Sequence, residues 1–197
     1  MTELTTREKL IQAALTLFSE KGYDATSVDE IAEAIGMTGP VIYKHFKGKE
    51  DLLKNVFDIS ENLFFNKEEY ADKLPIHIHN GEELKKFTWD QLNYTMNDDM
   101  AIKKRKLCTI EQYRKDELTR DATDHQYEDV INLYVGIFSY MMEEGTMEKN
   151  DPVLLSFMFS APIARLIQLS DMNPDRRDEA VDLIQKHMDF FVETYCQ

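Results

Sequence analysis

The sequence is poor in the residues that cross-link or interrupt a chain. Of its 197 residues, 2 are cysteine, 5 are proline and 7 are glycine. Cys108 and Cys196 lie far apart and form no Cys-x-x-Cys pair, so neither a disulfide framework nor a zinc knuckle is expected. The N-terminus has no signal-peptide apolar block, and no apolar run reaches the ~18 uncharged residues of a membrane span. We therefore expect a cytoplasmic protein with no membrane partner.

Strand patterns and enzyme motifs are also missing. No stretch alternates apolar and polar residues over more than a few positions, whereas helical spacing of apolar residues recurs nearly everywhere. The sequence contains no Gly-x-Ser-x-Gly elbow and no complete phosphate-binding loop. We therefore expect an all-α fold of about nine helices, no enzymatic activity and no cofactor.

The pair His77 and His79 could ligate a metal if the backbone there were extended, because alternate side chains would then share a face. Its neighbours Pro75 and Asn80 are more typical of an exposed loop. No metal site is therefore predicted.

Capping signals define the N-terminal helices. Thr5 and Glu8 have capping-box spacing ahead of a helix that should end at Gly22, and Ser27 and Glu30 repeat that spacing. The second helix should run from Ser27 to Ile35. A third, capped by Thr38 and ending at Phe46, and a fourth, from about Lys49 with a Leu52, Val56, Ile59 and Leu63 stripe, should follow. Later helices are expected near 82–97, 99–112, 116–143, 152–170 and 175–195, after a loop at 66–81.

Charge is unevenly distributed. The net charge is −14, and residues 50–197 carry 17 basic and 30 acidic residues, yet residues 37–49 hold three lysines, one histidine and no carboxylate. The two short helices around Gly36 match a helix-turn-helix, whose second helix enters the DNA major groove. Phosphate contacts need polar and cationic groups. That helix and the residues after it supply them as Thr38, Tyr43, Lys44, His45 and Lys49.

The same segment resembles the tetracycline-repressor (TetR) family of bacterial regulators over about residues 7–55. The resemblance rests on residues 22–28, 31–32, 36–38, 42–46 and 49–52, which read GYDATSV, IA, GMT, IYKHF and KEDL. It implies that Thr38 and Tyr43 contact phosphates, that Lys49 and the start of its helix meet the DNA backbone, and that Thr26 or Ser27 does the same. Base reading would fall to Gly39, Pro40 and Lys44, and Pro40 stands where many relatives carry glycine.

We expect two domains, a helix-turn-helix domain at 1–48 and a helical ligand-binding and dimerisation domain at 49–197. Residues 153–169 and the last helix have apolar faces wider than one neighbouring helix would cover. They predict a homodimer interface, although both helices could instead form the core of one subunit.

Aromatic and methionine side chains between residues 87 and 142 suit an adaptable pocket for a small-molecule effector. They suit a core equally well. The candidate pocket residues are Trp89, Tyr94, Tyr113, Tyr134 and Phe138.

The sequence thus favours a homodimeric, ligand-responsive transcriptional regulator, a repressor by preference, that binds a palindromic double-stranded DNA operator and is released by a small-molecule effector. The alternative is a helical small-molecule-binding protein whose N-terminal unit does not bind DNA. The placement of the lysines favours the regulator.

Overall fold

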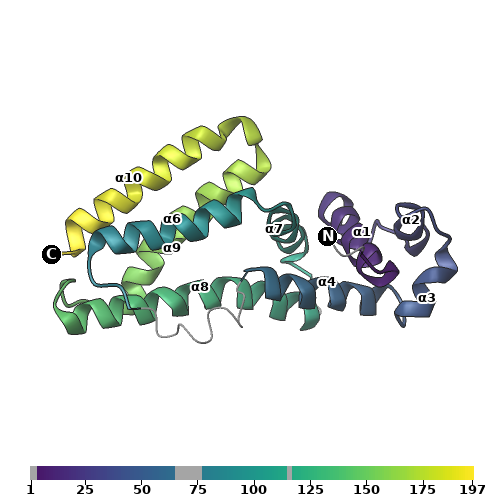
Figure 1. Ribbon diagram of the computed structural model, residues 1–197, viewed down its shortest axis with the longest axis horizontal. Helices are drawn as coiled ribbons and strands as arrows, with labels where there is room; N and C mark the ends of the chain where they lie inside the picture. Colours follow the sequence, from purple (N-terminus) through teal and green to yellow (C-terminus); the bar gives the residue numbers. More distant parts are fainter. Residues whose placement is uncertain (1–3, 65–76, 115–116) are drawn as a thin grey trace. The chain divides into compact units, whose positions relative to one another are not determined.

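The computed structural model describes residues 4–64, 77–114 and 117–197, with side-chain detail outside 59–64 and 117–127 (Figure 1). Within these ranges it contains nine α-helices, two short 3-10 helices and no strand, which confirms the all-α prediction. The α-helices are α1 (Thr6–Lys21), α2 (Val28–Glu33), α3 (Ile42–His45), α4 (Lys49–Phe64), α6 (Gly81–Asn97), α7 (Asp99–Glu111), α8 (Glu117–Glu144), α9 (Pro152–Met172) and α10 (Arg177–Tyr195). The 3-10 helices are η1 (Gly39–Val41) and η2 (Pro174–Arg176).

The chain divides into two compact units, and the first is discontinuous in sequence. It comprises Met1–Lys67 and Asp98–Thr123, whereas the second comprises Glu68–Asn97 and Asp124–Gln197. Packing therefore groups α4 and α7 with the N-terminal helices. The expected division at residues 48 and 49 is a division of function, and it stays a prediction.

The N-terminal caps form as their spacing predicts. The Thr5 side chain accepts a hydrogen bond from the Glu8 backbone N–H, and Glu8 in turn accepts from the Thr5 N–H. The α1 helix ends at Gly22, whose φ of 82° lies in the region that favours glycine. Ser27 and Glu30 form the second capping box at the start of α2. Helix α2 is shorter than expected and ends at Glu33.

The core of the first unit lies among α1, α2, α3, α4 and α7. Helix α1 packs against both α4 and α7, so a helix far along the chain completes the core. Phe46 is only 4% exposed and is an aromatic member of this core. The buried apolar residues are Leu10, Ile11, Ala14, Leu15, Phe18, Ile31, Ala32, Ile42, Phe46, Leu52, Leu53, Val56, Phe57, Leu107 and Cys108. Of the stripe predicted on the fourth helix, Leu52 and Val56 are buried, and the side chains of Ile59 and Leu63 lie outside the described residues, as does part of the predicted loop at 66–81.

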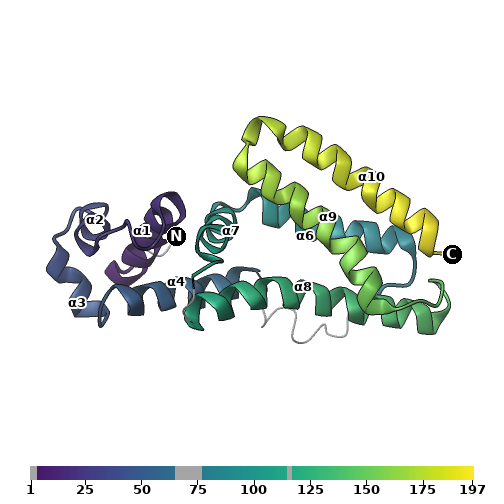
Figure 2. The same cartoon turned by 180° about the vertical axis from the view of Figure 1, so that it is seen from behind.

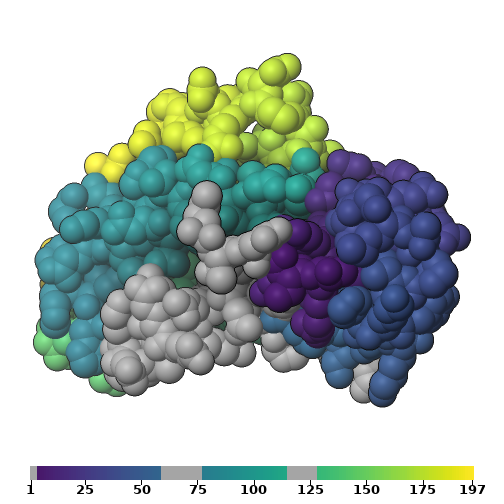
Figure 3. All heavy atoms as spheres, turned by 45° about the vertical axis from the view of Figure 1, so that its right-hand side comes forward, coloured from purple at the N-terminus to yellow at the C-terminus, as the bar shows by residue number. Residues whose placement is uncertain are grey.

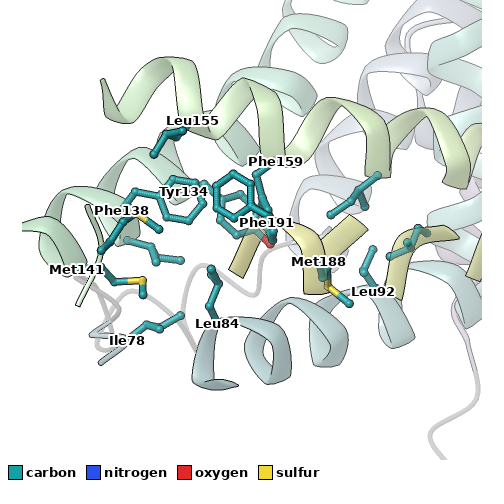
Figure 4. Packing of buried hydrophobic residues seen from close by; sticks show 14 of the residues in the cluster. Ile78, Leu84, Leu92, Tyr134, Phe138, Met141, Leu155, Phe159, Met188 and Phe191 are labelled. Atoms are coloured by element: carbon teal, nitrogen blue, oxygen red, sulfur yellow. The ribbon is translucent and has the colours of Figure 1, made fainter. Parts of the chain in front are cut away.

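The core of the second unit is built on aromatic rings. Figure 4 shows Tyr134, Phe138, Phe159 and Phe191 gathered together, and the Phe159 and Phe191 ring centroids lie 4.7 Å apart. Tyr134 and Phe138 come from α8, Phe159 comes from α9 and Phe191 comes from α10. Helices α9 and α10 run side by side (Figures 1 and 2). Their inner faces therefore supply one continuous core.

The outer faces of α9 and α10 remain apolar but exposed. On α9, Phe157 is 54% exposed, and on α10, Phe190 is 65% exposed. Val153, Leu154, Met158 and Leu183 are also exposed in these two helices. We call these six residues the outer apolar face; Met172, at the last position of α9, is exposed as well. By length and composition alone, α9 is long and apolar enough to cross a membrane.

Candidate nucleic-acid interface

The first and second helices of the predicted helix-turn-helix meet at a tight turn. Gly36 adopts a φ of 73°, and the Met37 N–H donates to the Ala32 carbonyl at 2.9 Å. A residue with a side chain would be strained at that φ, so glycine suits this position. The turn leads the chain directly from α2 into the second member of the motif.

The second member is not the single capped α-helix that the sequence predicts. It begins as the 3-10 helix η1 and continues as α3, and the Thr38 side chain makes no capping hydrogen bond. The reason is local. Pro40 has no N–H to donate, and the Val41 N–H donates to the Thr38 carbonyl at 3.0 Å. The expected capping role of Thr38 is therefore wrong, and its hydroxyl is not used in a cap.

Gly39 packs closely against the Asp29 side chain of α2. It is buried, and a Cβ atom built there would lie 1.8 Å from Oδ1 at the end of that side chain. The absence of a side chain lets η1 lie closely against α2. The expected base contact by Gly39 is not supported by this buried position.

The other predicted residues of this segment share an exposed surface, which we call the recognition face. Its members are Thr38, Pro40, Tyr43, Lys44 and His45. The Tyr43 side chain is 64% exposed, whereas Ile42 and Phe46 are buried in the core of the unit. Buried apolar residues thus anchor a short helix whose polar side chains point into solvent.

The recognition face is cationic and has no acid of its own. Residues 37–49 contain no carboxylate, and among the described residues none forms an ion pair with Lys44 or Lys47. The nearby Asp51 carboxylate accepts a hydrogen bond from the Lys47 backbone N–H at 2.8 Å. In the space-filling view, α1 to α3 form a closely packed surface, coloured purple to blue (Figure 3). A polyanion could therefore approach the exposed lysines.

Of the two hydroxyls predicted at the start of α2, one is not available. Thr26 is 1% exposed, and its hydroxyl donates to the Gly22 carbonyl at 2.9 Å. A phosphate contact by the Thr26 side chain is therefore excluded in this conformation, because a buried hydroxyl with a backbone partner stabilises the turn instead. Ser27 is exposed, and its hydroxyl donates to Glu30 Oε2 at 3.0 Å within the capping box.

Lys49 lies at the first position of α4 and is held by the turn between α1 and α2. Its Nζ lies 4.2 Å from the centroid of the Tyr23 ring and 3.5 Å from the Asp24 carbonyl oxygen. Burial lowers the pKa of Lys49. Sequence reasoning missed Tyr23, although its place beside the positive-φ glycine that ends α1 marks it as a turn residue.

The structure does not bring the five predicted pocket residues into one cavity. Tyr134 and Phe138 are buried in the core of the second unit, and the Tyr134 hydroxyl donates to Thr88 Oγ1 at 3.0 Å. Tyr94 is 42% exposed, and Tyr113 is 86% exposed and belongs to the first unit. For Tyr134 and Phe138 the core interpretation is correct.

Among the described residues, Trp89 lines a groove. The groove lies between α6 and α10, has a volume of about 370 Å³ and is open to solvent. Its lining residues are Glu82, Lys85, Lys86, Trp89, Gln185, Met188 and Asp189. Lys85 bridges its acidic rim, with Nζ 2.8 Å from Glu82 and 2.9 Å from Asp189.

His77 and His79 are exposed and both contact one tyrosine. The ring of His77 stacks on Tyr140 with centroids 4.4 Å apart, and His79 Nδ1 lies 3.3 Å from the Tyr140 hydroxyl. Within the described residues, no group of three or more His, Cys, Asp or Glu side chains could hold a metal ion. The pair is thus part of an aromatic cluster.

Known proteins are similar in sequence to the segment that contains the recognition face. Residues 10–56 match the model of the tetR family of bacterial regulatory proteins. The matched N-terminal segment is also 44% identical over 71 residues to the HTH-type transcriptional regulator AcrR of Shigella flexneri. That match covers 36% of this chain and 33% of AcrR, so the chain matches about a third of the length of this curated relative.

Two solved structures share the fold over nearly the whole chain. SmeT, the repressor of the Stenotrophomonas maltophilia multidrug efflux pump SmeDEF, is 19% identical with a TM-score of 0.71, covering 98% of this chain and 91% of SmeT. FadR from Bacillus subtilis, solved in complex with stearoyl-CoA, is 22% identical with a TM-score of 0.68, covering 93% of this chain and 96% of FadR. These three proteins are named as regulators of transcription or as a repressor.

Proposed function

We propose that the protein is a homodimeric transcriptional repressor that binds a palindromic DNA operator and is released by a small-molecule effector. The observation that carries the proposal is the recognition face. Its tyrosine, lysine and histidine are exposed within a carboxylate-free segment, while the rest of the chain is strongly acidic. A face of this kind meets the need of a helix flanked by phosphates.

Residues in and beside the recognition face would have distinct tasks. Thr38 and Tyr43 would donate to phosphate oxygens, and Lys49 would add a cation at the N-terminal end of α4, where the helix dipole also favours an anion. Lys44 and Pro40 would meet base edges, Lys44 as a donor to guanine and Pro40 as an apolar contact to a thymine methyl group. Ser27 would approach the backbone on the α2 side.

The direct test is a mobility-shift titration with duplex DNA taken from beside the protein's own gene. Tyr43→Ala and Lys44→Ala should each weaken binding, and Lys149→Ala, a change at an exposed lysine in the second unit, should leave it unaltered. The logarithm of the affinity should fall with the logarithm of the salt concentration, with a slope of ~0.9 for each neutralised phosphate. Absence of any shift with the fold intact would favour the alternative, a small-molecule-binding protein that does not bind DNA.

The homodimer rests on the outer apolar face of α9 and α10. The six large apolar side chains of this face are exposed on two adjacent helices, and clusters of exposed apolar residues often mark interaction surfaces. We propose that a second copy of the chain covers it in place of lipid, because α10 interleaves exposed Asp182, Lys186 and Glu193 with its apolar residues. Two-fold symmetry would then place two recognition faces on half-sites ~34–36 Å apart. Light scattering at micromolar concentration should give twice the chain mass of 23.1 kDa, and a monomer would contradict the proposal.

Effector release is supported by the fold shared with FadR, a regulator solved in complex with stearoyl-CoA. A coupling of about 1–3 kcal/mol would change operator affinity roughly 5- to 150-fold. Candidate effectors should therefore be screened by their effect on the mobility shift. A compound that stabilises the protein against heat without changing DNA affinity would show binding without regulation.

A further inference from the structure

The end of α7 is fastened to the turn between α1 and α2 by a buried carboxylate. Glu111 is 7% exposed, and its Oε1 accepts a hydrogen bond from the Tyr23 backbone N–H at 2.8 Å. A Cβ atom on Gly22 would lie only 3.2 Å from the same oxygen. A buried carboxylate requires such partners, because charge taken out of water without compensation is costly. The turn is therefore held close to the end of α7.

Arg114, three residues further along, joins the same cluster. Its Nη1 lies 3.0 Å from Asp24 Oδ1 and 3.5 Å from Glu111 Oε2. Its guanidinium carbon lies 4.2 Å from the centroid of the Tyr23 ring. The arginine thus bridges the α7 end to two consecutive residues of the turn.

Lys49 reaches the cluster from a third element, the start of α4. Its ammonium group contacts the same Tyr23 ring as the Arg114 guanidinium, at the same 4.2 Å distance from the centroid. The Tyr23 ring also packs against Phe18, and the two ring centroids lie 5.4 Å apart. A lysine at a helix N-terminus is disfavoured by the helix dipole. The ring and the Asp24 carbonyl oxygen offset that cost and restrict where the ammonium lies.

We propose that Tyr23, Glu111 and Arg114 are positioning residues that hold the Lys49 ammonium at the N-terminus of α4 for a DNA phosphate. This proposal rests on the proposed function, because it assumes that Lys49 meets the DNA backbone. The proposal adds that Glu111 at the end of α7 and Arg114 just beyond it, both distant from the helix-turn-helix in sequence, set the strength of one phosphate contact. Preorganisation of this kind lowers the cost of ordering a long side chain on binding.

The test is a double-mutant cycle on DNA affinity, measured with the duplex that the wild-type protein retains from a random pool. Lys49→Ala should reduce the salt slope by ~0.9, the value for one phosphate. Tyr23→Leu should weaken DNA binding roughly 2- to 5-fold, the range for an exposed cation–π contact. Tyr23→Phe keeps the ring and should bind DNA as tightly as the wild type. In the Lys49→Ala background, Tyr23→Leu should have no further effect.

Arg114→Gln provides a second, milder probe just beyond the end of α7, at a side chain that is 28% exposed. It should weaken DNA binding in the wild-type background, and it should have no effect once Lys49 is alanine. Arg176→Gln, which breaks an ion pair with Glu179 in the second unit, is the matched control and should leave affinity unchanged. Circular dichroism melting of each variant separates loss of fold from loss of positioning.

The outcomes distinguish the two proposals. If Lys49→Ala lowers affinity but Tyr23→Leu and Arg114→Gln weaken binding equally in both backgrounds, their effect is structural and the positioning role is overturned. If Lys49→Ala leaves affinity and salt slope unchanged while Tyr43→Ala weakens binding, the DNA-binding function stands and the positioning role fails. If the wild-type protein retains no duplex, both fail.

Discussion

Replacing Phe157 by alanine should weaken self-association of the chain without unfolding it. Phe157 lies on the outer face of α9 and is 54% exposed, so its ring contributes little to the core of its own subunit. A phenylalanine buries roughly 150–250 Å² in all, so about 100 Å² remains to be covered by a partner. At about 25 cal/mol per Å² this area is worth about 2.5 kcal/mol, of which alanine would forfeit about 2 kcal/mol.

The effect should be doubled by symmetry. In a two-fold dimer the same patch contributes from both copies, so the substitution should cost about 4 kcal/mol and raise the dimer dissociation constant roughly a thousandfold. Sedimentation equilibrium over a range of concentrations measures this directly. Tyr113→Ala, at an 86% exposed aromatic residue outside α9 and α10, should leave the constant unchanged. A Phe157→Ala protein that dimerises as tightly as the wild type would refute the assignment of this face.

Three further predictions concern stability. Lys21 and the Ser27 N–H together lower the pKa of Glu30 from 4.5 to about 2. The carboxylate therefore stabilises the fold above pH 4.5, and this stabilisation is lost as the pH falls towards 2. The melting-temperature difference between the wild type and Glu30→Gln should shrink over that pH range. Tyr134→Phe should cost about 1–3 kcal/mol in urea denaturation because it leaves the buried Thr88 hydroxyl without its donor, and adding Thr88→Val should recover part of that loss. Gly39→Ala should lower the melting temperature, since its methyl group would displace Asp29 and separate η1 from α2; an unchanged melting temperature would show that Asp29 moves aside freely.

Signals that act over one or two turns of helix were readable from the sequence. The capping boxes at Thr5 and Ser27 and the glycine after α1 fix helix ends through hydrogen bonds between residues at most four apart. The predicted later helices agree with the structure to within two residues at each end. Exposure of Tyr43 and burial of Phe46 followed from the apolar spacing of one short segment.

What the sequence could not provide depends on contacts between distant segments or on competing local bonds. The packing of α7 against α1 joins residues about ninety positions apart, so Glu111 and Arg114 could not be connected with Tyr23. The family resemblance implied a DNA contact by Thr26 or Ser27, and it did not indicate that the Thr26 hydroxyl donates inward to the Gly22 carbonyl four residues earlier.

Aromatic side chains posed a different problem. Helical spacing predicts which residues face inward, but it does not say whether the space they face is filled. Tyr134 and Phe138 pack ring against ring with Phe159, whereas Trp89 lines an open groove. The two environments differ because different residues of later helices pack against these side chains. Only the structure could therefore decide between core and pocket.

The discontinuity of the first unit limits how such a protein can be recombined. The family match ends at residue 56, yet the hydrophobic cluster around α1 and α4 includes Leu107 and Cys108 from α7. A chimera that grafts only the first 67 residues onto a tetR-family regulator would therefore leave that cluster facing a foreign helix. Exchange of operator specificity should succeed more often when residues 98–123 travel with the graft.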